Sequence, residues 1–116
     1  MFKKTLSGIR DRVDGTLAIS LIGLDGIAIE SINDAHVPLD VLGAEFGRFV
    51  RSIRPNTEIG TGEVRQFSLV TDRYVTFLSE VTSDYYILLV LRPDGNYGRA
   101  RFELARAKDL LRDELI

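Results

Sequence analysis

The sequence contains no cysteine and a single histidine. Without cysteine, disulfide bonds and thiolate metal sites are excluded, and this usage fits a cytoplasmic protein. No apolar run reaches the roughly 18–20 residues that a membrane-spanning helix needs, and polar side chains from Ser7 onward interrupt any signal-peptide core. The net charge of −2 leaves no cationic surplus to neutralise phosphates. We therefore expect neither membrane insertion nor a nucleic-acid partner.

The sequence also lacks a group of residues that would form a reaction centre. His36 lies in a polar stretch beside Asp34, and no second histidine or cysteine exists to share a metal ion or a proton. Turn chemistry explains Asp25 better than catalysis by a pair with Glu30 would. The glycines of Gly60–Gly62 are not followed by the Gly-Lys-Ser/Thr and helix of a phosphate-binding loop. We expect no catalytic residue, no cofactor, no metal site and hence no enzyme.

The most informative segment that is present runs from Leu17 to Ile32. Two apolar, β-branched runs flank Asp25-Gly26, a pair that commonly supplies the positive backbone dihedrals of a tight hairpin turn. The pattern predicts antiparallel strands over 16–23 and 27–32. Alternation along the first strand places three apolar side chains on one face, namely Leu17, Ile19 and Leu21.

Helical spacing of apolar residues predicts three helices. The first covers 3–14, and the second covers 38–54, with Pro38 in its first turn. The third is long and begins after Asn96, which is a good N-cap residue. The second helix carries one continuous apolar stripe, formed by Leu39, Leu42, Phe46, Phe49, Val50 and Ile53.

Three closely spaced strands are predicted over 63–70, 74–81 and 84–91. The last is apolar on both faces, so we expect it beside the first strand in the middle of the sheet, with cover on both sides. The polar strand over 63–70 reads as an edge. The fold class is therefore α+β in the order α-β-β-α-β-β-β-α, a five-stranded antiparallel sheet between helices, with residues 1–116 forming one domain.

This order and its motifs resemble the Roadblock / dynein light chain family, most closely the bacterial gliding-protein branch that regulates small Ras-like GTPases. The matching features are the Gly23–Gly26 hairpin, the helix after Pro38, the strand start at Gly62–Val64, the Tyr85–Leu91 strand and the Asn96–Arg99 helix entry. The resemblance covers Leu6 to Leu115, and its motifs are structural rather than catalytic. It implies a profilin-like three-layer fold. It also implies a homodimer, in which helix two packs on its copy and strand three pairs with its copy into one ten-stranded sheet.

The residues themselves offer some support for such a dimer. Helix two has Gly43, Ala44 and Gly47 on the side away from its apolar stripe. Each helical glycine costs about 0.8–1 kcal/mol relative to alanine, which favours a surface where another backbone comes close. The alternative is that the glycines let the helix sit tightly on its own sheet. With the unpaired edge of strand three, the predicted dimer interface comprises Gly43, Ala44, Gly47, Val64, Gln66 and Ser68.

Three arginines lie on the outer side of helix two, namely Arg48, Arg51 and Arg54. Such a row could meet an acidic partner or insert an arginine finger into a bound GTPase, and the alternative is a solvated helix face. The resemblance favours docking over a finger, so we assign these three residues to GTPase binding. In the final helix, Arg99 and Arg101 crowd the start against the preference of the helix dipole. An acidic partner or a screened, exposed surface would each account for that placement.

The leading hypothesis is a non-catalytic, homodimeric regulator that binds a Ras-like small GTPase in bacterial polarity or motility. Stimulation of GTP hydrolysis is implied by the resemblance alone. One alternative is a dimeric adaptor that leaves GTP turnover unchanged. Another alternative is a small-ligand sensor. The sequence offers no polar cluster that would orient a ligand, which argues against this alternative.

Overall fold

The computed structural model describes residues 2–53 and 64–115. The elements in chain order are α1 (Phe2–Arg12), β1 (Thr16–Gly23), β2 (Ala28–Asn33), α2 (Leu39–Ile53), β3 (Gln66–Val70), β4 (Val75–Thr82), β5 (Tyr85–Leu91) and α3 (Tyr97–Leu115). The predicted order is confirmed, although α1 ends at Arg12 rather than residue 14 and β3 begins at Gln66 rather than residue 63. The predicted helix stop and loop over 54–62 lie outside the described residues.

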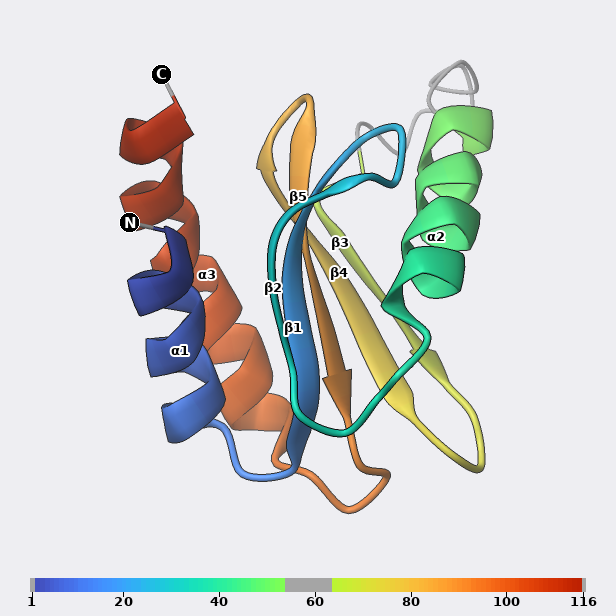
Figure 1. Cartoon of the computed structure of the whole chain (residues 1–116), viewed down its shortest axis with the longest axis vertical. Coiled ribbons are helices and arrows are strands. Elements are labelled where there is room, and N and C mark those ends of the chain that lie inside the picture. Colours follow the sequence, from blue (N-terminus) through green and yellow to red (C-terminus); the bar gives the residue numbers. More distant parts are fainter. Residues whose placement is uncertain (1, 54–63, 116) are drawn as a thin grey trace.

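The strands form one antiparallel sheet in the order β2-β1-β5-β4-β3. The two most apolar strands, β1 and β5, are neighbours in the middle, and β3 is an edge, both as predicted. The second edge is β2. Helices α1 and α3 lie together on one face of the sheet, and α2 lies alone on the other (Figure 1). The result is the predicted three-layer α+β fold.

Strand β5 supplies side chains to a core on each face of the sheet. Ile87 and Leu89 are fully buried in the core beneath α1 and α3, while Leu88 and Val90 are fully buried in the core beneath α2. This alternation explains why the strand has no polar face, because both of its faces are covered. The predicted central position with cover on both sides is confirmed.

One face assignment in β1 is wrong. Ile19 and Leu21 belong to the core beneath α1 and α3, but Leu17 packs against the core beneath α2. The β1–β5 register shifts between Thr16 and Ala18. Such an irregularity breaks the strict alternation on which the prediction rested, so Leu17 points to the opposite face.

The β1–β2 turn is longer than the two-residue turn that Asp25-Gly26 predicts. The Gly23 amide donates to the Ile27 carbonyl at 2.9 Å, so the loop has three residues. Gly26 has a φ of 87°, but Asp25 does not share the positive φ. Its carboxylate instead accepts the Ile27 N–H at 3.0 Å. This arrangement fits the three-residue hairpin loop, in which glycine takes the left-handed position.

Helix α3 begins as predicted, because the Arg99 amide donates to the Asn96 side-chain oxygen at 3.0 Å. This bond satisfies one of the N–H groups that the first helical turn leaves unpaired.

Within residues 2–53 and 64–115, no helix combines the length and apolar character needed to cross a membrane.

Candidate partner-binding surfaces

An apolar surface extends from α2 onto the edge strand β3. The Phe67 ring lies 5.5 Å from Phe46 and 4.9 Å from Phe49, measured between ring centroids. Phe46 is buried, whereas Phe49 is 47 % exposed and Leu69 is 50 % exposed. Between helix and strand runs a groove of about 450 Å³, which we call the α2–β3 groove, lined by Leu42, Glu45, Phe46, Phe49, Phe67, Ser68 and Leu69. The apolar stripe of α2 thus continues beyond the part that its own sheet covers.

The α2–β3 groove borders an open strand edge. β3 pairs with β4 on one side and has no described strand on the other. The predicted interface residues Gln66 and Ser68 are exposed on β3, and Val64 is half-buried just before it. Val70, at the other end of β3, is 63 % exposed. The structure therefore brings three of the predicted dimer residues together beside the groove.

The contacts of Gly43 and Gly47 favour the alternative in which these glycines let α2 sit tightly on its own sheet. Both are buried, and a Cβ atom at Gly43 would lie 2.9 Å from the Gly26 carbonyl oxygen. A Cβ at Gly47 would lie 2.9 Å from the Leu24 carbonyl oxygen. The backbone that approaches these glycines is the chain's own β1–β2 hairpin, so they are not evidence for a second copy. Ala44 is exposed beside them, although its own backbone also lies against Gly26.

The arginines of α2 have different local contacts. Both Arg48 and Arg51 are exposed. Arg48 forms an ion pair with Glu45 at 3.5 Å, one turn away on the same helix. Arg51 reaches across to the hairpin and donates to the Leu24 carbonyl. Arg54 lies outside the described residues. Arg48 is therefore presented to solvent, while Arg51 helps to hold the hairpin against α2.

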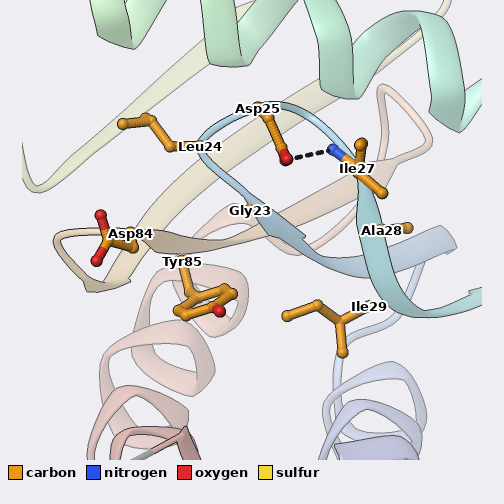
Figure 2. A pocket seen from close by; sticks show the side chains of 8 residues that line it. All are labelled: Gly23, Leu24, Asp25, Ile27, Ala28, Ile29, Asp84 and Tyr85. Carbon is orange, nitrogen blue, oxygen red and sulfur yellow. Dashed lines mark hydrogen bonds between the residues drawn. The ribbon is translucent and has the colours of Figure 1, made fainter.

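A second concavity, of about 390 Å³, lies at the β1–β2 hairpin and is called here the hairpin pocket. It is lined by Gly23, Leu24, Asp25, Ile27, Ala28, Ile29, Asp84 and Tyr85. Figure 2 shows Asp84 and Tyr85 on one side of Gly23, with Ile27, Ala28 and Ile29 on the other. The Leu24 amide donates to the Asp84 carbonyl at 2.9 Å, which ties the hairpin to the β4–β5 turn.

On the opposite face, α1 and α3 are joined by an ion cluster around a buried carboxylate. The Glu103 side chain is fully buried and lies 3.0 Å from Arg12 and 3.0 Å from Arg99, with Arg106 at 3.7 Å. A buried charge needs such partners to offset its desolvation. Arg101 lies over the Phe77 ring, 5.4 Å from its centroid. Intramolecular contacts thus account for both arginines that crowd the start of α3.

The single histidine lies away from both concavities. His36 is exposed in the β2–α2 connection and has a φ of 56°. Among the residues that the structure describes, no group of three or more His, Asp or Glu side chains is placed to hold a metal ion.

Sequence reasoning missed the aromatic contact that defines the α2–β3 groove. Periodicity places Phe49 in the apolar stripe of the second helix without saying what covers it, and the strand that contains Phe67 is predicted only as a polar edge. The available signal was the apolar series Phe67, Leu69 and Val70 in a strand already expected at the edge. Apolar side chains on an unpaired edge strand are a sign of association.

Comparisons with known proteins identify solved structures that share the fold of this chain. No protein-family model matches the sequence, and no curated protein matches it. MglC from Myxococcus xanthus is 29% identical, with a TM-score of 0.69 over 97% of this chain and 98% of its own. A Roadblock/LC7 domain from Streptomyces avermitilis is 21% identical, with a TM-score of 0.82 over 97% and 95%. The gliding protein MglB from Thermus thermophilus is 15% identical, with a TM-score of 0.84 over 96% and 85%. These matches confirm the predicted resemblance: the chain has the Roadblock/LC7 fold and stands among the structures of Roadblock/LC7 domains and gliding proteins.

Proposed function

We propose that the protein is a non-enzymatic homodimer that docks a Ras-like small GTPase. The α2–β3 groove is the observation that supports the dimer, because exposed Phe49 and Leu69 lie there next to a strand edge that pairs with no other described strand. The proposal that the partner is a GTPase rests on the resemblance to bacterial Roadblock regulators. The gliding proteins among the structural neighbours support the same assignment.

The dimer forms by self-association of this surface about a two-fold axis. β3 of each copy pairs with β3 of the other, which extends the sheet to ten strands and covers the β3 edge of each copy. The two α2 helices then cover the groove from each side. Burying Phe49, Leu69 and Val70 removes half-exposed apolar side chains from water, at about 25 cal/mol for each Å². The predicted residues Gln66 and Ser68 lie in the paired strands, and Val64 lies at their margin.

The GTPase docks on the outer side of the paired α2 helices, where Arg48 supplies positive charge. Docking is favoured over an arginine finger, because Arg48 has Glu45 beside it and Arg51 is engaged by the Leu24 carbonyl. A finger must reach the transferring phosphate unhindered. The same observation favours a second candidate function, an adaptor dimer that binds its partner without altering GTP turnover.

The experiment uses the purified protein and the Ras-like GTPase encoded nearest to its gene. Calorimetry with a non-hydrolysable GTP analogue measures binding, and phosphate release measures turnover. Binding with faster turnover supports the regulator, and binding with unchanged turnover supports the adaptor. Absence of binding to the GTP-analogue and GDP forms overturns the GTPase assignment.

Arg48→Ala tests the docking site, with Arg112→Ala on α3 as the matched control, because both arginines are exposed. We expect about two- to fivefold weaker binding from Arg48→Ala, the range of one exposed ion pair, and no change from Arg112→Ala. Equal effects of the two substitutions would contradict the placement of the GTPase on α2.

A further inference from the structure

The hairpin pocket has a chemical character that neither the sheet core nor the α2–β3 groove shares. Its lining combines two exposed branched residues, Ile27 at 69 % and Ile29 at 42 % exposure, with Asp25, Asp84 and Tyr85. In Figure 2 the Asp84 carboxylate lies at the outer margin of the concavity, turned away from the Tyr85 ring. Figure 2 shows the Ile29 side chain directed toward Tyr85 across the concavity. No cation within residues 2–53 and 64–115 forms an ion pair with Asp25 or Asp84.

The pocket is held in shape by contacts on both sides of the hairpin. The Leu24 amide donates to the Asp84 carbonyl at 2.9 Å, while the Leu24 carbonyl accepts from Arg51 on α2. Gly26 lies against the backbone of Gly43 and Ala44. A site whose walls are fixed before binding loses less conformational entropy when a ligand arrives. The hairpin is thus preorganised rather than a free loop tip.

The geometry of β2 decides what kind of contact the pocket can make. β2 is a sheet edge, but its register with β1 moves from Leu21–Glu30 to Ile22–Ala28, so Ile29 has no partner residue. A bulge of this kind interrupts the ladder and discourages the addition of a long strand. Recognition at this edge therefore depends on side chains that enter the pocket, not on extension of the sheet.

We propose that the hairpin pocket captures a lysine or arginine side chain from a basic, partly apolar segment of a partner protein. Asp25, and Asp84 at the margin of the pocket, form no ion pair and supply negative charge that attracts the cationic head, while Ile27 and Ile29 pack against the methylene stem. Tyr85 presents an aromatic ring, a group that also favours a nearby cation. This inference does not depend on the GTPase or on the dimer, because every lining residue belongs to one chain and none lies in the α2–β3 groove.

The test is an NMR titration of the isotope-labelled protein with a capped hexapeptide, Gly-Leu-Arg-Leu-Lys-Gly. The matched probe is Gly-Leu-Glu-Leu-Glu-Gly. We expect the basic peptide to shift the amide signals of residues 23–29, 84 and 85, with an affinity that falls as salt rises. We expect no such shifts with the acidic peptide. Shifts centred elsewhere, or equal shifts with both peptides, overturn the proposal.

Variants sharpen this test without disturbing the fold. Asn retains the side-chain oxygen that accepts the Ile27 N–H, so Asp25→Asn combined with Asp84→Asn removes charge and keeps the turn. We expect the double variant to bind the basic peptide about fivefold more weakly. Asp72→Asn, in the β3–β4 turn at the opposite end of the sheet, is the single-charge control and should bind as the unmodified protein does.

Two further outcomes would overturn the assignment. Unchanged binding by the double variant would show that the carboxylates do not recognise the cation. If instead the signals of residues 23–29 move when the protein alone is concentrated, the occupant is a second copy of this chain rather than another protein.

Ile27→Ser, at a side chain that is 69 % exposed and outside the core, should weaken binding through loss of an apolar wall.

Discussion

The two faces of the sheet each carry an exposed phenylalanine, yet the surroundings of these rings differ. Phe102 on α3 is 56 % exposed and has the Arg99 guanidinium over its ring at 5.5 Å. Phe49 on α2 is 47 % exposed, contacts Phe67 and continues into the α2–β3 groove. Exposure alone therefore does not mark a docking surface. A contiguous apolar patch beside an open strand edge does.

The helices are also attached to the sheet in different ways. On one face, α1 and α3 are joined through buried Glu103 and its three arginines. On the other, α2 lies against the hairpin through Gly43 and Gly47, with a single guanidinium crossing to Leu24. On the first face, the buried Glu103 carboxylate and the exposed Phe102 ring have cationic partners within the chain. The second leaves apolar surface uncovered, which is why we place association there.

The largest effect on stability is expected inside the α1–α3 face. Leu104 is fully buried, so Leu104→Ala should lower the free energy of unfolding by about 2–5 kcal/mol through lost contacts and a residual cavity. Leu110→Ala, at a side chain that is 53 % exposed on the same helix, should change it by less than about 0.5 kcal/mol. Urea unfolding at one fixed protein concentration measures both. Similar losses would show that the two sides of α3 are not differently packed.

The same substitution on each face of the sheet tests most directly whether only the α2 face takes part in self-association. Phe49→Glu places a charge in the proposed dimer surface and should weaken self-association at least about 30-fold. Phe102→Glu should leave self-association unchanged, because its ring lies away from the groove. Sedimentation equilibrium over a range of concentrations gives both dissociation constants. Equal weakening by the two variants would remove the distinction between the faces.

A smaller loss is expected from the ion cluster. Glu103→Gln leaves Arg12, Arg99 and Arg106 without their shared carboxylate, which should cost about 1–3 kcal/mol of unfolding free energy. The guanidiniums are partly exposed, so the lower part of that range is expected. Glu45→Gln, which removes only the exposed pair with Arg48, should cost under about 1 kcal/mol. Urea unfolding compares them, and a cost for Glu45→Gln as large as that for Glu103→Gln would contradict the buried role of Glu103.

The smallest effect concerns the start of α3. Asn96→Ala removes the acceptor for the Arg99 amide and should cost about 1 kcal/mol. Asn96→Asp keeps an oxygen in the same position and should restore most of that loss. Thermal unfolding followed by circular dichroism distinguishes the two variants. A loss from Asn96→Asp as large as that from Asn96→Ala would mean that the cap does not set the start of the helix.

Periodicity was sufficient to predict the element order, the central strand pair and the edge position of β3. These features follow from local patterns, such as the two-faced apolar run Tyr85–Leu91 and the cap at Asn96. The face of Leu17 was not predictable, because a register irregularity between β1 and β5 determines it. The true length of the hairpin turn likewise depends on the bond from Gly23 to Ile27.

The candidate sites were less accessible from the sequence, because they depend on which segments meet. Gly43 and Gly47 were correctly identified as points of close backbone approach, but the approaching backbone is the chain's own hairpin. Spacing along a helix cannot distinguish a contact within the chain from one with a partner. Likewise, Arg48 and Arg51 look equivalent in sequence, and only the structure shows that Arg51 binds the Leu24 carbonyl whereas Arg48 pairs with Glu45 on its own helix.

The most direct test of the dimer is the mass of the unmodified protein in solution, measured by light scattering after size exclusion at micromolar concentrations. Covering the α2–β3 groove by a second copy predicts a particle of twice the 13.0 kDa chain mass. A particle that keeps the mass of one chain across the concentration range would contradict the account.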